Sequence, residues 1–145
     1  MKLQDLLAEG FGNQEDYNCA EKIIYGANRA YDLGLSEESC RLFAGFGGGM
    51  ASGHICGAIV SSVGILSHLF VQNKAHQSEE IHRLEKEFLA KFEQYAQSTM
   101  CHDLKKKYFI KGEGCHDLLI QVGAILDELI IANKDKIVVD KEFDI

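Results

Sequence analysis

The sequence predicts an all-helical fold, a compact bundle in a single domain of residues 1–145. The chain contains no proline, so no proline interrupts long helices, and the proline-containing turns that separate the strands of an all-β fold are missing. Its apolar residues recur at steps of three and four, which is the period of a helix face. A chain of this length usually forms one domain and can bury a core. We therefore expect about five or six helices around a buried apolar helix at residues 55–71.

The first two predicted helices lie on either side of Gly34. Residues 16–33 have helical spacing with apolar side chains on one side, and we expect this helix to end at Gly34. Ser36 is a suitable N-cap for the second helix, and two glutamates follow it in the first turn, where the helix dipole favours negative charge. This second helix leads into a glycine-rich stretch at residues 45–53.

The most apolar stretch of the chain is predicted to form the central helix. Residues 55–71 are apolar all round, which is typical of a buried helix. The serines, glycines and His68 within the stretch make it too polar for a membrane span. Gly57, Ser61 and Gly64 lie four and three residues apart, so they form one stripe of small residues that another backbone can approach closely.

Two amphipathic helices are expected in the second half of the chain. Ser78 is a suitable N-cap for the first, whose apolar residues continue at steps of three and four as far as Tyr95. Residues 116–132 carry the second apolar stripe. The tail, residues 136–145, is expected to be extended or frayed.

The charge of the chain excludes some classes of function. The formal net charge is -7, so the basic surface that binds nucleic acid or anionic lipid is missing. The one basic run, residues 105–107, is typical of a solvated helix face. The N-terminus lacks the apolar segment of a signal peptide, so we expect a cytoplasmic protein.

The chain contains five cysteines. An odd number argues against a disulfide framework and favours metal ligands or redox groups.

Four of the five cysteines fall near predicted helix starts, whereas Cys40 falls within a helix. A helix N-terminus offers free N–H groups and the positive end of the dipole, and both stabilise a thiolate. We expect these four thiols to converge on one site and Cys40 to remain apart from it. The four candidate site residues are Cys19, Cys56, Cys101 and Cys115.

The cysteine spacing leaves three interpretations open. No C-x-x-C occurs, so the zinc-ribbon, thioredoxin and ferredoxin patterns are missing, and any site must be assembled from separate helices. The thiolates could hold an iron–sulfur cluster or a zinc ion as cofactor, with electron transfer as the function. Alternatively, pairs of them could cycle between thiol and disulfide without a metal. In the third interpretation, the chain is a helical interaction module whose cysteines only pack.

The glycines near these cysteines are further candidates for cofactor binding. Successive glycines let backbone N–H groups converge on an anion or on a cluster sulfur. A tight connection between two helices explains the same stretch equally well. The candidates are Gly47, Gly48, Gly49 and Gly57.

Three short motifs and the two later single cysteines together resemble a known family. The motifs are Asn18-Cys19-Ala20-Glu21, Phe46-Gly47-Gly48-Gly49 and Cys56-Gly57-Ala58. The family is the redox-active one named for its CGAxxG motif and four cysteines, written C_GCAxxG_C_C, and the resemblance covers nearly the whole chain. It implies that the family cysteines are the four candidates above. One departure is clear, because Ser61 stands where the family motif ends in glycine.

The resemblance also implies what kind of chemistry to expect. The family is similar to the protein part of split-Soret cytochromes, for which an iron–sulfur site has been proposed, and its genes often neighbour transporter genes. It therefore implies a four-cysteine redox site and an electron-transfer or transporter-associated partner, and it names no substrate. Separately, the large apolar helix surface of this short chain favours a homodimer, since closed dimers are the commonest soluble assemblies.

Overall fold

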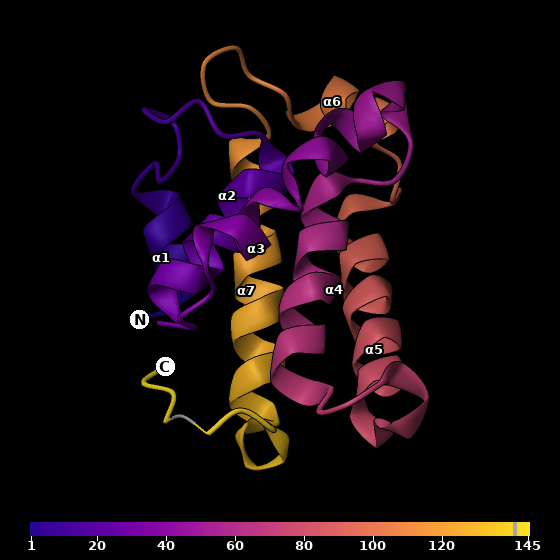
Figure 1. Ribbon diagram of the computed structural model, residues 1–145. Coiled ribbons are helices and arrows are strands. Elements are labelled where there is room, and N and C mark those ends of the chain that lie inside the picture. Colours follow the sequence, from indigo (N-terminus) through magenta and orange to yellow (C-terminus); the bar gives the residue numbers. More distant parts are fainter. Residues whose placement is uncertain (141) are drawn as a thin grey trace.

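The computed structural model describes residues 1–140 and 142–145, and it confirms the all-helical fold (Figure 1). Among these residues there are seven α-helices and two isolated β-bridges, and no strand. The helices are α1 (Leu3–Ala8), α2 (Cys19–Ala30), α3 (Glu37–Arg41), α4 (Gly57–Phe70), α5 (Glu79–Ala96), α6 (Cys101–Tyr108) and α7 (His116–Ala132).

Helix α4 forms the centre of the core, as predicted. It packs against α2, α5 and α7, and Ile59, Leu66 and Phe70 are among its fully buried side chains. The helix begins two residues later than expected, because Ile55 pairs with Met100 in an antiparallel bridge. No helix of the described residues is both long enough and apolar enough to cross a membrane.

The small residues of α4 make the close contacts that their spacing predicts. The Ser61 hydroxyl donates a 2.7 Å hydrogen bond to the backbone carbonyl of Ala20 in α2. A Cβ atom added at Gly64 would lie 2.5 Å from the ring of Phe43. The stripe is therefore the surface on which α2 and the segment after α3 approach α4.

Local capping explains where α2 begins. The Asn18 side chain accepts a 2.9 Å hydrogen bond from the backbone N–H of Glu21, whose carboxylate accepts a 3.0 Å bond from the N–H of Asn18. This reciprocal capping box starts the helix at Cys19. The predicted start at residue 16 was therefore too early, and the helix also ends before the expected residue 33, at Ala30. In contrast, Ser78 caps α5 and α7 spans residues 116–132, as the sequence predicts.

Helix α1 is the one helix that the sequence did not predict, and it raises the number above the expected five or six. The buried Asp127 carboxylate of α7 accepts hydrogen bonds from the first two backbone amides of α1, those of Leu3 at 2.8 Å and Gln4 at 3.0 Å. It also accepts a 2.5 Å bond from the hydroxyl of Tyr31. A distant carboxylate thus caps α1 and holds it against α7 and α2.

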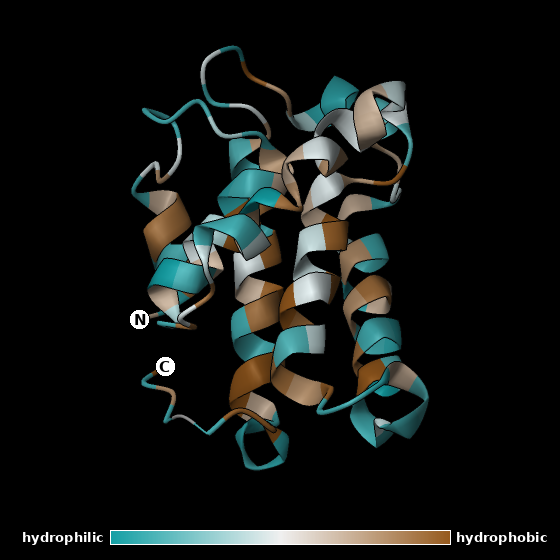
Figure 2. Cartoon of the chain, viewed as in Figure 1, coloured by the Kyte–Doolittle hydropathy of each residue, from teal (hydrophilic) through white to brown (hydrophobic). Residues whose placement is uncertain are grey.

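The central helices of the bundle are more hydrophobic than its connections, and two of them start at the same end. Hydrophobic residues are concentrated on α4 and α7, whereas the connections at both ends are largely hydrophilic (Figure 2). Helices α4 and α7 both begin at the end of the bundle where α6 lies, the upper end in Figure 1. Because helix N-termini carry partial positive charge, this end of the fold is suited to anionic side chains.

Candidate functional site

Four helix starts position the four candidate cysteines. Cys19 and Cys101 are the first residues of α2 and α6, while Cys56 and Cys115 are the residues immediately before α4 and α7. The predicted relation between these cysteines and helix starts is therefore confirmed. Cys40 is buried within α3 and does not line the cavity that the site forms.

The glycine-rich stretch holds two of these helix starts next to each other. The segment from Gly48 to Ala51 makes one left-handed turn, with φ of 64°, 61°, 59° and 58° at its four residues. Two of them, Met50 and Ala51, are not glycine, and a left-handed conformation costs such residues about 1–2 kcal/mol each. Strain of this kind persists only where the surrounding packing requires it, and it is concentrated at functional sites.

Close packing around Gly49 explains why the turn adopts this conformation. A Cβ atom there would lie 2.5 Å from the backbone nitrogen of His54 and 2.8 Å from the Cβ of Cys101. The backbone N–H of Cys101 donates to the His54 carbonyl at 2.6 Å, and that of Cys56 donates to the Thr99 carbonyl at 2.8 Å. These bonds place the Cys56 and Cys101 segments side by side.

The other candidate glycines lie against the start of α2. A Cβ atom at Gly47 would collide with the Asn18 side chain, and one at Gly57 would lie 3.0 Å from the Cβ of Ala20. Gly48 lines the cavity of the site. Gly47 and Gly57 thus allow close packing against the start of α2, and the role of the four glycines in binding a cofactor remains a prediction.

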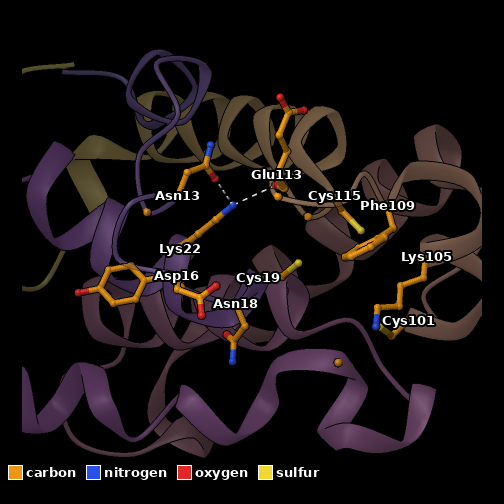
Figure 3. Close-up of a pocket in the computed structure, with 15 residues that line it drawn as sticks. Asn13, Asp16, Asn18, Cys19, Lys22, Cys101, Lys105, Phe109, Glu113 and Cys115 are labelled. Atoms are coloured by element: carbon orange, nitrogen blue, oxygen red, sulfur yellow. Dashed lines mark hydrogen bonds between the residues drawn. The ribbon is translucent and has the colours of Figure 1, made fainter.

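A cavity of about 290 Å³ lies between the helix starts and is lined by Cys19, Cys101 and Cys115. The sulfur atoms of Cys19 and Cys115 point into the same space from opposite sides, and Cys101 lies beside Lys105 (Figure 3). Cys115 is buried and Cys19 is partly exposed. The cavity therefore brings thiols from three separate helices into one small volume.

Cys19 and Cys115 form a coupled pair. A hydrogen bond from the Cys115 side chain lowers the pKa of Cys19 to about 7, against the opposing effect of burial, and Lys22 and Lys105 add to the lowering. The same hydrogen bond raises the pKa of Cys115, and burial raises it further. The pair therefore loses one proton readily and the second with difficulty, as expected for two interacting acids.

The other two thiols are within electrostatic reach of this pair. Burial raises the pKa of Cys56 to about 12, and the Cys19 charge acts in the same direction. Burial and the Cys19 charge also raise the pKa of Cys101. The charges of Cys56 and Cys101 in turn raise the pKa of Cys115. The fold thus assembles one group of four mutually interacting thiols.

The type of donor atom in the site fits a metal ion, but the placement of the donors does not. Four thiols are the ligand set of an iron–sulfur cluster or of structural zinc. Among residues 1–140 and 142–145, however, no group of three or more Cys, His, Asp or Glu side chains is placed to hold a metal ion. The donor type fits a metal, but the present arrangement does not fit one unless the thiols move closer together.

Sequence reasoning missed two lysines of the site. Lys22 is 5 % exposed, and its ammonium donates to the Asn13 side-chain oxygen at 2.6 Å and to the Glu113 carbonyl at 3.1 Å (Figure 3). It follows Cys19 by three residues on α2, a spacing that places both side chains on one face of the helix and could have revealed it. Lys105 lies one turn after Cys101 and also lines the cavity.

Comparison with known proteins identifies the family. A family model described as "Putative redox-active protein (C_GCAxxG_C_C)" matches residues 17–129, which is more than half of the chain. No curated protein and no solved structure matches the chain. Ser61, which departs from the family motif, is fully buried and uses its hydroxyl to bind α2, so the close contact is preserved. The chain therefore belongs to the redox-active C_GCAxxG_C_C family.

Proposed function

We propose that this protein carries out thiol–disulfide exchange, with Cys19 and Cys115 alternating between a dithiol and a disulfide. The observation that carries the proposal is that both thiols line one cavity from separate helix starts, where each shifts the pKa of the other. Two thiols that face the same small volume are suited to forming a disulfide. Each also lies at a helix start, where the dipole favours the thiolate that attacks a disulfide.

The proposed exchange has two steps. First, the Cys19 thiolate attacks one sulfur of an external disulfide, which forms a mixed disulfide and releases one external thiolate. Cys115 then passes its proton to the released external thiolate and attacks the sulfur of Cys19, which releases the second external thiolate. One protein disulfide and two external thiols result, and two electrons pass from the protein to the external disulfide.

The surroundings of each cysteine suit these roles. Cys19 is partly exposed, and its pKa of about 7 gives a substantial thiolate fraction at neutral pH. Cys115 is buried behind it and keeps its proton until the mixed disulfide forms. Cys56 is buried, and its pKa of about 12 keeps it protonated, which suits a packing role during the exchange.

Trapping the mixed disulfide tests this proposal. In Cys115→Ser, a small external disulfide should leave one half of itself attached to Cys19, because the thiol assigned to release it is missing. In Cys19→Ser, the buried Cys115 should remain largely unmodified, and Cys40→Ser should behave like the unmodified protein. Intact mass and peptide mapping distinguish these products. Equal trapping in both site variants would contradict the assigned roles.

A second candidate function is the binding of an iron–sulfur cluster or zinc for electron transfer. The observation in its favour is the set of four thiols at four helix starts, since helix dipoles offset the mutual repulsion of thiolates. A cluster would supply one-electron chemistry, and a zinc ion would be structural. Holding either would require movement of the four cysteines.

Metal analysis after anaerobic reconstitution tests this second candidate. Protein treated with iron and sulfide should develop the visible absorption of a cluster, and a Cys101→Ser variant should lose it, whereas Cys40→Ser should retain it. Stoichiometric metal with four thiols protected from alkylation would favour this function over thiol–disulfide exchange. Both proposed functions suit a reducing cytoplasm and an electron-transfer or transporter-associated partner, and the homodimer remains a prediction.

A further inference from the structure

The cavity has a basic side that thiol–disulfide exchange by itself does not require. Lys22 and Lys105 line the same cavity as Cys19, Cys101 and Cys115. The positive charges of both lysines lower the pKa of Cys19. Lys22 is buried in the cavity wall, whereas Lys105 is exposed at its rim.

The two hydrogen-bond partners of Lys22 are neutral. Its two hydrogen bonds go to an amide oxygen of Asn13 and to the backbone carbonyl of Glu113. Within the part of the chain that the structure describes, the ion pairs do not include Lys22. An ammonium has three N–H donors, so one donor is left for another group. The Cys19 thiolate offsets part of the Lys22 charge. When Cys19 is bonded in the mixed disulfide that negative charge is gone, and an anion in the cavity would then offset the cost of the buried ammonium.

The acidic residues of the cavity wall do not neutralise this lysine. Glu113 presents its backbone carbonyl to Lys22, while its carboxylate points away (Figure 3). Asp16 is exposed and makes no ion pair with Lys22. The remaining wall near the thiols includes the ring of Phe109, over which the Lys105 ammonium lies 5.3 Å from the ring centre. An apolar surface thus adjoins the two positive charges.

We propose that the external disulfide is a small molecule that carries a carboxylate, bound by Lys22 and Lys105 with its sulfur facing Cys19. This inference rests on the proposed thiol–disulfide exchange and names the class of its substrate. The cavity, at about 290 Å³, is near the lower end of the range for small-molecule sites. The alkyl part of the disulfide packs on Phe109, and the thiol product leaves with the same carboxylate.

Three symmetric disulfides of similar length but different charge test the inference. They are 3,3′-dithiodipropionate, which is anionic, 2-hydroxyethyl disulfide, which is neutral, and cystamine, which is cationic. Each rate of protein oxidation is divided by the rate of the same disulfide with free 2-mercaptoethanol, so that intrinsic reactivity cancels. We expect the corrected rate to be about tenfold higher for the anionic than for the cationic reagent at low salt, and less at high salt.

Variants at the basic side sharpen the test. Lys105→Gln should reduce the preference for the anionic reagent about threefold. Because Lys105 is exposed, the substitution should leave the fold intact. Lys106→Gln is the matched control, because its side chain is exposed and does not line the cavity; it should keep the preference. Lys22→Gln should reduce the preference further. Any change in the Cys19 pKa affects all three reagents alike and cancels in the ratio.

The outcomes separate this inference from the proposed function. Equal corrected rates for the three reagents, or a preference for cystamine, would overturn the carboxylate site while leaving thiol–disulfide exchange intact. An unchanged preference in Lys105→Gln, or an equal loss of preference in Lys105→Gln and Lys106→Gln, would also overturn it. If none of the reagents produces a protein disulfide between Cys19 and Cys115, the proposed function fails, and this inference fails with it.

Discussion

Cys115, at the start of α7, and Cys19, at the start of α2, line the same cavity and shift each other's pKa in opposite directions. This coupling links two helices that are far apart in the sequence and makes the titration of the two thiols interdependent. It distinguishes this pair from Cys40, which is buried in α3 away from the cavity.

The first prediction concerns the alkylation of Cys19 in the reduced, metal-free protein. Because the pKa of Cys19 is lowered to about 7, its reaction with iodoacetamide should rise with pH with a midpoint near that value. Cys115→Ala removes the largest cause of the lowering, so the midpoint should move to higher pH. Peptide mass spectrometry over a pH series measures both curves, with Cys40→Ser as the control. An unmoved midpoint in Cys115→Ala would contradict the hydrogen bond.

A second prediction concerns stability at alkaline pH. The pKa of Cys56 is about 12 in the fold, against an ordinary value of 9.0. The stability linked to this thiol is therefore fully present below pH 9 and is lost as the pH rises toward 12, by about 1.4 kcal/mol per pH unit. Denaturant unfolding under reducing conditions should show this decline, and Cys56→Ala should show a shallower one. The same slope in both proteins would refute the assignment.

Asp127 is expected to be essential for the docking of α1. Asp127→Asn removes the charge and replaces one acceptor oxygen by an NH2 group that faces the backbone donor of either Leu3 or Gln4, so it should cost about 3 kcal/mol of unfolding free energy. Tyr31→Phe removes one bond to the same carboxylate and should cost about 1–2 kcal/mol. Glu128→Gln, at a surface ion pair with Lys91, is the control and should cost under about 1 kcal/mol. Urea unfolding tests the order, and equal losses in the three variants would contradict it.

Gly64 provides a test of the packing between α4 and Phe43. A side chain at Gly64 must displace the Phe43 ring, so Gly64→Leu should cost about 1–3 kcal/mol. Gly45→Leu is a suitable control, because a Cβ atom at Gly45 has no neighbour within 4 Å. Thermal unfolding should give a lower melting temperature for Gly64→Leu than for the control. An unchanged melting temperature in Gly64→Leu would show that the stripe is not a tight contact.

Local signals explain which helices the sequence could predict. Ser78 and the acidic turn after it mark the start of α5, and the apolar period marks α7, because both signals act within one or two turns of the chain. Helix α1 was not predicted, because the residue that caps it, Asp127, lies near the other end of the chain. A long-range carboxylate leaves no pattern near Leu3.

The site was predictable to a similar degree. The four helix-start cysteines could be recognised from caps and flanking acids, but the contact between Cys19 and Cys115 depends on how α2 and α7 pack. The left-handed turn at Met50 and Ala51 was not predictable, since neither residue favours that conformation and only packing against α6 explains it. The partners of Lys22 also come from segments distant in sequence.

The most direct test of the account is the disulfide map of the oxidised protein. Fully reduced, metal-free protein is treated with one equivalent of a small disulfide, free thiols are blocked, and the linked peptides are identified by mass spectrometry. We expect a single major disulfide, between Cys19 and Cys115, with Cys40 and Cys56 recovered as blocked thiols. A protein that forms no internal disulfide, or that mainly links other cysteines while Cys19 and Cys115 stay free, would contradict the proposed thiol–disulfide exchange.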